Sequence, residues 1–321
     1  MRSHRAFSTN GRDSQISPLV SAFVERTGDG SASAWDVIRE RVLALQREAS
    51  LGIPDDVLMN CARLRNIVTI EEQKGLSSDG FIEPLGSSLA NGFRVVLREG
   101  APSSRQRFTL AHEICHTFFY EAAPELKLSA YKEDSFEEAL CNYGAGCLLV
   151  PETAIRESDL ALRPCLPSLE TLCEMFKVSH ETMVVRLRSL GLWRCEYSLW
   201  HRMTGGEFII DRLYGWKRID WNWSDAVVLE KAWCSGRLHR GKTILWWETS
   251  TGYSTGKSVH YEIKRRGDLL VALWDDRTLY EQLPPLLTLK KREGTKRRGT
   301  LSATPKVHGS AEQGKRYWWT E

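Results

Sequence analysis

The sequence holds one HExxH pattern, in the segment Arg107-Phe108-Thr109-Leu110-Ala111-His112-Glu113-Ile114-Cys115-His116-Thr117-Phe118-Phe119-Tyr120. Residues four apart on a helix differ in direction by about 40°, so the imidazoles of His112 and His116 can reach one ion. Glu113 lies about 100° from His112, beside such an ion, where a carboxylate can take a proton from a water molecule that the ion activates. Because the opposite face is apolar, the segment predicts a buried helix with a metal at one edge.

This helix is expected to begin at Ser103 and to run to about Tyr120. Ser103 and Gln106 are three residues apart and fit a capping box, in which side chains bond the amides of the first turn. Cys115 is the sulfur nearest to the histidines in the sequence, but it lies about 100° behind His116 and faces away from the ion. Because a catalytic zinc takes three protein ligands and keeps one open position, the third ligand should come from another element.

A second helix, expected over residues 135–149, offers that ligand. Glu138 and Asn142 share one face of it, so Glu138 can bind the ion while Asn142 bonds the far nitrogen of a ligating histidine. Glu137 is the alternative ligand, and both glutamates could instead be ordinary charges at the start of a helix. The Gly-Ala-Gly at 144–146 is a poor choice for a helix, and it predicts a close approach to the first helix.

Two more side chains are candidates for a part in catalysis. A hydrogen-bond donor that holds the developing oxyanion would help the reaction. Tyr120 could supply it because it falls between His116 and Glu113 on a helical wheel, although a plain core aromatic is the alternative. His180 is expected to be a first-turn residue of a surface helix, with no role.

Two blocks of sequence together resemble a known family. The first reads RxRFTLAHExxH from Arg105 to His116, and the second reads ExxxN, small residues and LLxP from Glu138 to Pro151. In this order they resemble the ImmA/IrrE zinc metallo-endopeptidases, over roughly residues 34–193. The resemblance implies a zincin-like, gluzincin-type domain with the Zn²⁺ ligands His112, His116 and Glu138 and the catalytic base Glu113.

The resemblance also implies a function and a partner. Family members act as anti-repressors, which cut a helix-turn-helix repressor and so release a stress response or a mobile-element programme. This chain departs from the common pattern at Cys115, often Gly, at residues 143–145, often Phe-Ala-Ala, and at Val150, often Met; none of these removes a catalytic group. The expected function is a regulatory zinc endopeptidase that cleaves a helix-turn-helix repressor.

The sequence predicts an α+β chain of four parts. Residues 1–30 are polar and rich in Ser and Gly, and are expected to be disordered. Residues 31–193 should form the mostly helical peptidase domain with a small sheet, including a helix-turn-helix-like pair at 168–190. Residues 194–287 should form a Trp-rich α+β module, and residues 288–321 a basic flexible tail. Nine of the twelve tryptophans lie between Trp193 and Trp274; they could sense a ligand, dock a substrate or simply fill a core.

Hydrophobic periodicity and turn residues place the individual elements. The segment from residue 75 to 92, rich in Gly and Ser, is expected to be a connection without regular structure. The helices expected are 34–50, 54–65, 103–120, 135–149, 168–176, 180–190 and 224–234, and the strands 67–70, 93–97, 207–212, 243–249, 258–264 and 269–274.

Charge and composition exclude several classes of protein. Residues 288–321 hold nine Lys/Arg and three Asp/Glu. The other 287 residues hold 35 Lys/Arg and 38 Asp/Glu, so only the tail has the basic charge that is typical of nucleic-acid binding. The longest uncharged run is 13 residues, where a membrane span needs about 20. The eight cysteines form no CxxC pair, and no apolar signal segment precedes them. The protein is therefore expected to be cytoplasmic, with reduced thiols and no membrane partner.

The competing function is a DNA- or partner-binding regulator or sensor with a vestigial or structural metal site. The helix pair at 168–190 has the length of a helix-turn-helix. A reading helix would carry Arg, Lys, Asn or Gln at its start, whereas here it starts His-Glu-Thr-Met, and Arg186 and Arg188 come later. Packing or docking to a partner is favoured over DNA binding for this pair, and direct nucleic-acid contact is expected only through the tail.

Overall fold

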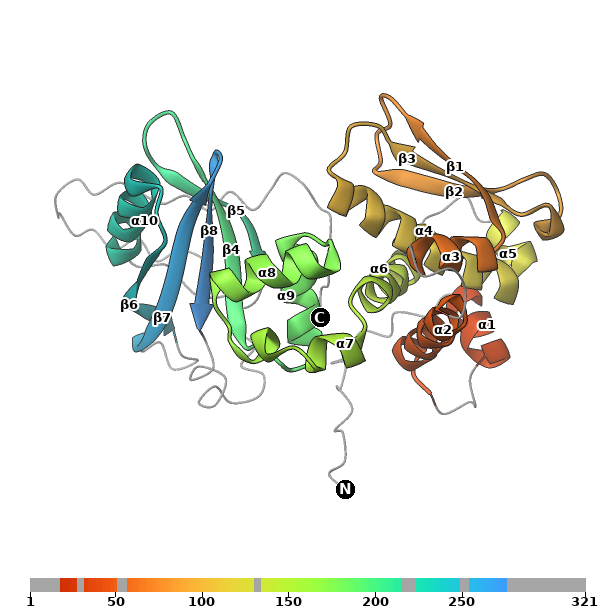
Figure 1. The fold of residues 1–321 in the computed structure, drawn as a ribbon, viewed down its shortest axis with the longest axis horizontal. Helices are drawn as coiled ribbons and strands as arrows, with labels where there is room; N and C mark the ends of the chain where they lie inside the picture. Colours follow the sequence, from red (N-terminus) through yellow and green to blue (C-terminus); the bar gives the residue numbers. More distant parts are fainter. Residues whose placement is uncertain are drawn as a thin grey trace, which may run out of the picture. The chain divides into compact units, whose positions relative to one another are not determined.

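The computed structural model describes residues 18–27, 32–50, 57–129, 134–214, 223–248 and 254–275. They divide into two compact units, an N-terminal unit that ends at Leu149 and a C-terminal unit that starts at Val150 (Figure 1). Helices and small sheets occur in both, which confirms the α+β class. The predicted boundaries at 193 and 287 stay predictions, and residues 276–321, with the basic tail, lie outside the described part.

The N-terminal unit packs helices beneath a three-stranded sheet (Figure 1). Its long helix α4 spans Ser103–Ala122 and packs against α6, Ser135–Leu149, and α2, Ala34–Ala49, also packs against α6. Gln46 of α2 donates a hydrogen bond to the carbonyl of Leu148 at 2.8 Å, which ties these two helices. The shorter helices are α1 (Pro18–Thr27), α3 (Val57–Leu64) and α5 (Pro124–Ser129).

The sheet has the strand order β1-β3-β2, in which β1 and β3 are parallel and β2 is antiparallel. The strands are β1 (Ile67–Gln73), β2 (Gly80–Pro84) and β3 (Phe93–Arg98), and a short 3-10 turn, η1, covers Leu89–Asn91. The expectation of an irregular connection over residues 75–92 is therefore wrong, because β2 pairs there along the whole of β3. Gly80 permits this, since a Cβ on it would meet Thr109 of α4 at 2.6 Å.

The expectation that residues 1–30 are wholly disordered is wrong for α1. Its side chains Val20 and Phe23 are fully buried, and the Phe23 ring lies 4.5 Å from that of Phe119 in α4. Arg26 donates a hydrogen bond to the carbonyl of Ala122 at 2.7 Å, at the end of α4. The polar composition hid a short amphipathic helix that caps α4 and covers its last turns.

The C-terminal unit is built on a five-stranded antiparallel sheet in the order β5-β4-β8-β7-β6. Helix α10 covers one face, and α8 and α9 lie on the other (Figure 1). The sequence missed β4, whereas the strands predicted at 258–264 and 269–274 pair as a hairpin, with Arg266 paired to Leu269. The elements are α7 (Glu152–Arg156), η2 (Asp159–Leu162), α8 (Leu166–Phe176), α9 (His180–Ser189), β4 (Cys195–Arg202), β5 (Phe208–Tyr214), α10 (Trp223–Ser235), β6 (His239–Glu248), β7 (Ser254–Arg266) and β8 (Leu269–Asp275).

Two tryptophans form the centre of the core beneath α10. Trp200 and Trp274 are fully buried among apolar side chains of the sheet and the helix. Both indole N–H groups donate to the hydroxyl of Ser198, at 2.9 and 3.1 Å. These contacts show how the module accommodates bulky aromatic volume without leaving the indole donors unpaired.

His180 is buried, so its expected place on the surface is wrong. It is the first residue of α9 but only 4% exposed, and its Nδ1 lies 3.1 Å from the hydroxyl of Tyr197 in β4. Burial lowers the pKa of His180 to about 4, and Arg266 adds to this effect. The imidazole is therefore neutral in the folded protein at neutral pH.

This buried imidazole should make stability depend on pH. Unfolding raises its pKa to about 6.5, so the unfolded state binds more protons between pH 6.5 and 4. The contribution of His180 to the free energy of unfolding is complete above pH 6.5. It decreases as the pH falls, by up to about 3 kcal/mol near pH 4. Urea unfolding from pH 7 to 4 should show a flatter profile for His180→Gln than for the parent. His201→Gln, at a half-exposed side chain, is the control, and equal slopes in all three proteins would contradict the prediction.

No helix among the described residues is both long and apolar enough to cross a membrane.

Candidate metal centre

Helix α4 carries both histidines of the HExxH pattern. The helix does not begin with the predicted capping box: its N-cap is Pro102, and Gln106 instead donates to the carbonyl of Arg98. Its central turns are nearly all buried, and the side chains of His112 and His116 are only 13% and 7% exposed. The imidazoles therefore lie at a buried edge, as their spacing predicts.

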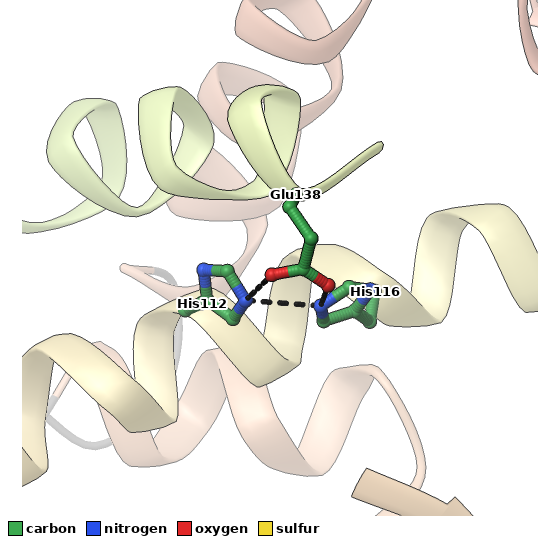
Figure 2. Close-up of side chains that lie close together, drawn as sticks. All are labelled: His112, His116 and Glu138. Atoms are coloured by element: carbon green, nitrogen blue, oxygen red, sulfur yellow. Dashed lines mark hydrogen bonds and ion pairs between the residues drawn. The ribbon is translucent and has the colours of Figure 1, made fainter. Parts of the chain in front are cut away.

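Helix α6 brings Glu138 to these imidazoles (Figure 2). One carboxylate oxygen lies 3.1 Å from Nε2 of His112, and the other lies 3.2 Å from Nε2 of His116. The two Nε2 atoms are 3.0 Å apart, and the three residues each offer a ligand atom within 4.8 Å of the others. The side chain of Glu138 is 38% exposed, so the site opens to solvent on its side.

The far nitrogen of each imidazole has its own partner on α6. Nδ1 of His112 lies 2.8 Å from Oδ1 of Asn142, as predicted for that asparagine. Nδ1 of His116 lies 2.6 Å from Oε1 of Glu137. An amide oxygen and a carboxylate only accept hydrogen bonds, so each Nδ1 carries a hydrogen. When a ring is neutral, the lone pair of its Nε2 therefore faces Glu138.

These tautomers create a cluster of acceptors that fits a divalent cation. Two Nε2 lone pairs and two carboxylate oxygens converge with no hydrogen between them when both rings are neutral, which is costly without a positive charge. Burial opposes protonation of His116, but Cys141, Glu137 and Glu138 outweigh it, so the pKa of His116 is raised well above its usual value. Two imidazoles and one carboxylate are a donor set that suits zinc.

Glu113 lies on the same helix and is 5% exposed. Burial raises its pKa more than the neighbouring His112 and His116 lower it. A carboxylate with a raised pKa is a better proton acceptor, which suits the predicted role of Glu113 as a general base.

The sequence missed the actual place of Glu137. Glu137, the alternative ligand, is 2% exposed and bonds Nδ1 of His116, on the side that faces away from Glu138. With His116 and Cys141 it forms a second, buried group that could hold a metal ion. Its Oε1 also accepts a hydrogen bond from Lys127 of α5 at 2.5 Å. The signal available in the sequence was the pair of adjacent glutamates, since neighbours on a helix point about 100° apart and so can reach different atoms of one ring.

Tyr120 is 8% exposed and packs as a core aromatic. Its ring centroid lies 5.1 Å from that of Phe93 and 5.3 Å from the ammonium of Lys127. Burial raises the pKa of Tyr120, so its hydroxyl stays protonated and able to donate. Its part in holding an oxyanion stays a prediction.

Gly144 sets the spacing between α4 and α6. A Cβ on Gly144 would lie 2.7 Å from Sγ of Cys115 and 3.2 Å from Cγ1 of Ile38. This close approach explains the small residue that the sequence singled out. It also links two departures from the family pattern, Cys115 in place of Gly and Gly144 in place of Ala. The sulfur of Cys115 occupies the space that a side chain at 144 would need.

Gly144→Ala should therefore destabilise the protein. Overpacking costs about 1–3 kcal/mol, and the gain in helix propensity offsets about 1 kcal/mol of it. In a Cys115→Ala background the same change should be neutral or stabilising. Gly146→Ala is the matched control, since a Cβ there meets nothing within 4 Å. Urea unfolding measures all four variants, and additive effects of the changes at 115 and 144 would contradict the packing argument.

Comparison with known proteins finds one family match and one similar solved structure. Residues 72–188 match the family described as IrrE N-terminal-like domain, peptidase M78. A Mycobacterium tuberculosis transcriptional regulator of known structure is similar at 15% identity and a TM-score of 0.48, over 83% of this chain and 82% of that one. A search of curated proteins finds no match. The matched segment contains both α4 and α6, so the helices that carry the candidate ligands lie in the part of the chain that is similar to the IrrE N-terminal-like domain.

Proposed function

We propose that this protein is a zinc-dependent endopeptidase with the ligands His112, His116 and Glu138. One observation carries the proposal: two Nε2 lone pairs and a carboxylate converge, while Asn142 and Glu137 hold the outer nitrogens. Ligating histidines in metalloenzymes are oriented in this way by acceptors on their far side. A cytoplasmic location is part of the proposal.

Each residue around the ion would have a separate role in peptide hydrolysis. When bound, zinc would supply Lewis acidity that activates water and polarises the peptide carbonyl. Glu113 would take the proton of that water and pass it to the leaving amine. Tyr120 would donate to the developing oxyanion. The partly exposed side of Glu138 would be the side on which the substrate binds.

The proposed substrate is a helix-turn-helix repressor, so the protein would act as an anti-repressor. The support is the M78 domain, together with the resemblance of the two motif blocks to the ImmA/IrrE peptidases. Cleavage would release the repressed genes, which makes the peptidase regulatory.

The structure gives little support to DNA reading by α9. Five of its residues are buried: His180, Met183, Val184, Arg186 and Leu187. Its basic side chains bond backbone carbonyls of the same unit: Arg186 donates to Val150 and Arg188 to Cys195. A helix that enters a DNA groove needs a free face with side chains that reach the bases.

Metal analysis and a cleavage assay test the proposal. The purified protein should contain one zinc per chain and cut a helix-turn-helix repressor. A chelator should stop cleavage, and added zinc should restore it. If the protein binds no zinc, or if cleavage continues after the metal is removed, the proposal fails.

A further inference from the structure

Two charged side chains form a row on the outer side of His116. Nζ of Lys127, in α5, donates to Oε1 of Glu137 at 2.5 Å. The same oxygen lies 2.6 Å from Nδ1 of His116. The side chains of Glu137 and His116 are 3% and 7% exposed, and that of Lys127 is 17% exposed. One carboxylate oxygen thus joins the lysine to the predicted zinc ligand.

We infer that Lys127 is a positioning residue that acts through Glu137 to hold the His116 ring in the tautomer and orientation that bind zinc. This inference rests on the proposed function and adds a residue from α5 to the centre.

The two ligating rings are held in unequal ways. His112 bonds a neutral amide, Asn142, which needs no counter-charge. His116 bonds a buried carboxylate, and a buried carboxylate is costly unless a cation compensates it. Lys127 is the cation that bonds this carboxylate, so it keeps Glu137 in place as an ionised acceptor.

The charges around the centre are consistent with this role. Glu113, Glu137 and Glu138 bring three negative charges, and Lys127 brings one positive charge. A divalent ion would complete a neutral group. Lys127 is itself fixed, because its ammonium lies over the ring of Tyr120 at 5.3 Å. The lysine can therefore limit the freedom of the Glu137 carboxylate, and with it that of the imidazole.

A double-mutant cycle for zinc affinity in the full-length protein tests the inference. Competition with a chelator should show that Lys127→Met binds zinc about tenfold more weakly than the parent. Loss of a residue that bonds a zinc ligand typically weakens metal binding about ten- to a hundredfold, so this is the lower end of that range. Glu137→Gln should weaken binding by about ten- to a hundredfold, and adding Lys127→Met to it should change little. Lys127→Arg should restore the parent affinity. Lys264→Met, which breaks a lysine–glutamate pair in the C-terminal unit, is the matched control.

Several outcomes would overturn the inference. Unchanged affinity in Lys127→Met would do so, as would an equal loss in the Glu137→Gln background. Tighter zinc binding in Lys127→Met would mean that the charge acts directly on the ion.

A second measurement does not depend on zinc. In the zinc-free protein, ¹⁵N-histidine spectra should show the Nδ1–H of His116 in the parent, and this signal should exchange faster with water in Lys127→Met. An unchanged signal in Lys127→Met would overturn the inference, whether or not the protein binds zinc. A protein that binds no zinc would instead overturn the proposed function.

Discussion

Glu113→Gln should abolish peptide cleavage while leaving zinc bound. Glu113 lies beside the three predicted ligands and is not one of them, so the ion should keep its donors. The amide has the same shape as the carboxylate but cannot take a proton, and loss of a general base of this kind costs about a thousandfold in rate. Burial raises the pKa of Glu113, so a neutral side chain should be tolerated there without loss of stability.

Cleavage of the repressor and metal content should be measured on the same preparation. Glu121→Gln is a suitable control, because Glu121 is on the same helix with a 55% exposed side chain. It should cut at the parent rate. A Glu113→Gln protein that cuts as fast as the parent would show that another group is the base.

Glu138→Ala should remove zinc and leave the fold near intact. This carboxylate is the one predicted ligand on α6, and the imidazoles of His112 and His116 hold its pKa far below the usual value in spite of burial. It is therefore anionic at neutral pH, and its loss removes the main charge that attracts the ion. Zinc affinity should fall by more than a hundredfold, beyond the effect of an outer partner.

Chelator competition and thermal unfolding of the zinc-free protein separate the two parts of this prediction. The side chain of Glu138 is 38% exposed, so its truncation leaves no large cavity. Glu48→Ala, at an exposed position on α2, is the control for general effects. Parent-like zinc stoichiometry in Glu138→Ala would move the third ligand elsewhere.

The sequence predicted the helices of the site well because their signals are local. The four-residue spacings of His112 with His116 and of Glu138 with Asn142 are properties of one helix, and each pair points as the period requires. Gly144 was identified from helix propensity alone, and the structure supplied its neighbour, Cys115.

What the sequence did not predict depends on contacts between distant segments. The strand β2 lies in a Gly- and Ser-rich segment, and it is recognisable only through its pairing with β3. The helix α1 is stabilised by burial of Phe23 against Phe119, almost a hundred positions away. The role of Glu137 depends on which nitrogen of His116 each glutamate of α6 reaches, and spacing along a chain does not specify that nitrogen.

The contact of Cys115 with Gly144 has a consequence for the evolution of this protein. Between the backbones of α4 and α6 there is room for one small side chain, and it can come from position 115 or from position 144. Relatives with glycine at 115 can therefore carry alanine at 144, whereas bulky residues at both positions would separate the imidazoles from the carboxylate. In an alignment of close relatives these two columns should covary, although neither residue touches the ion.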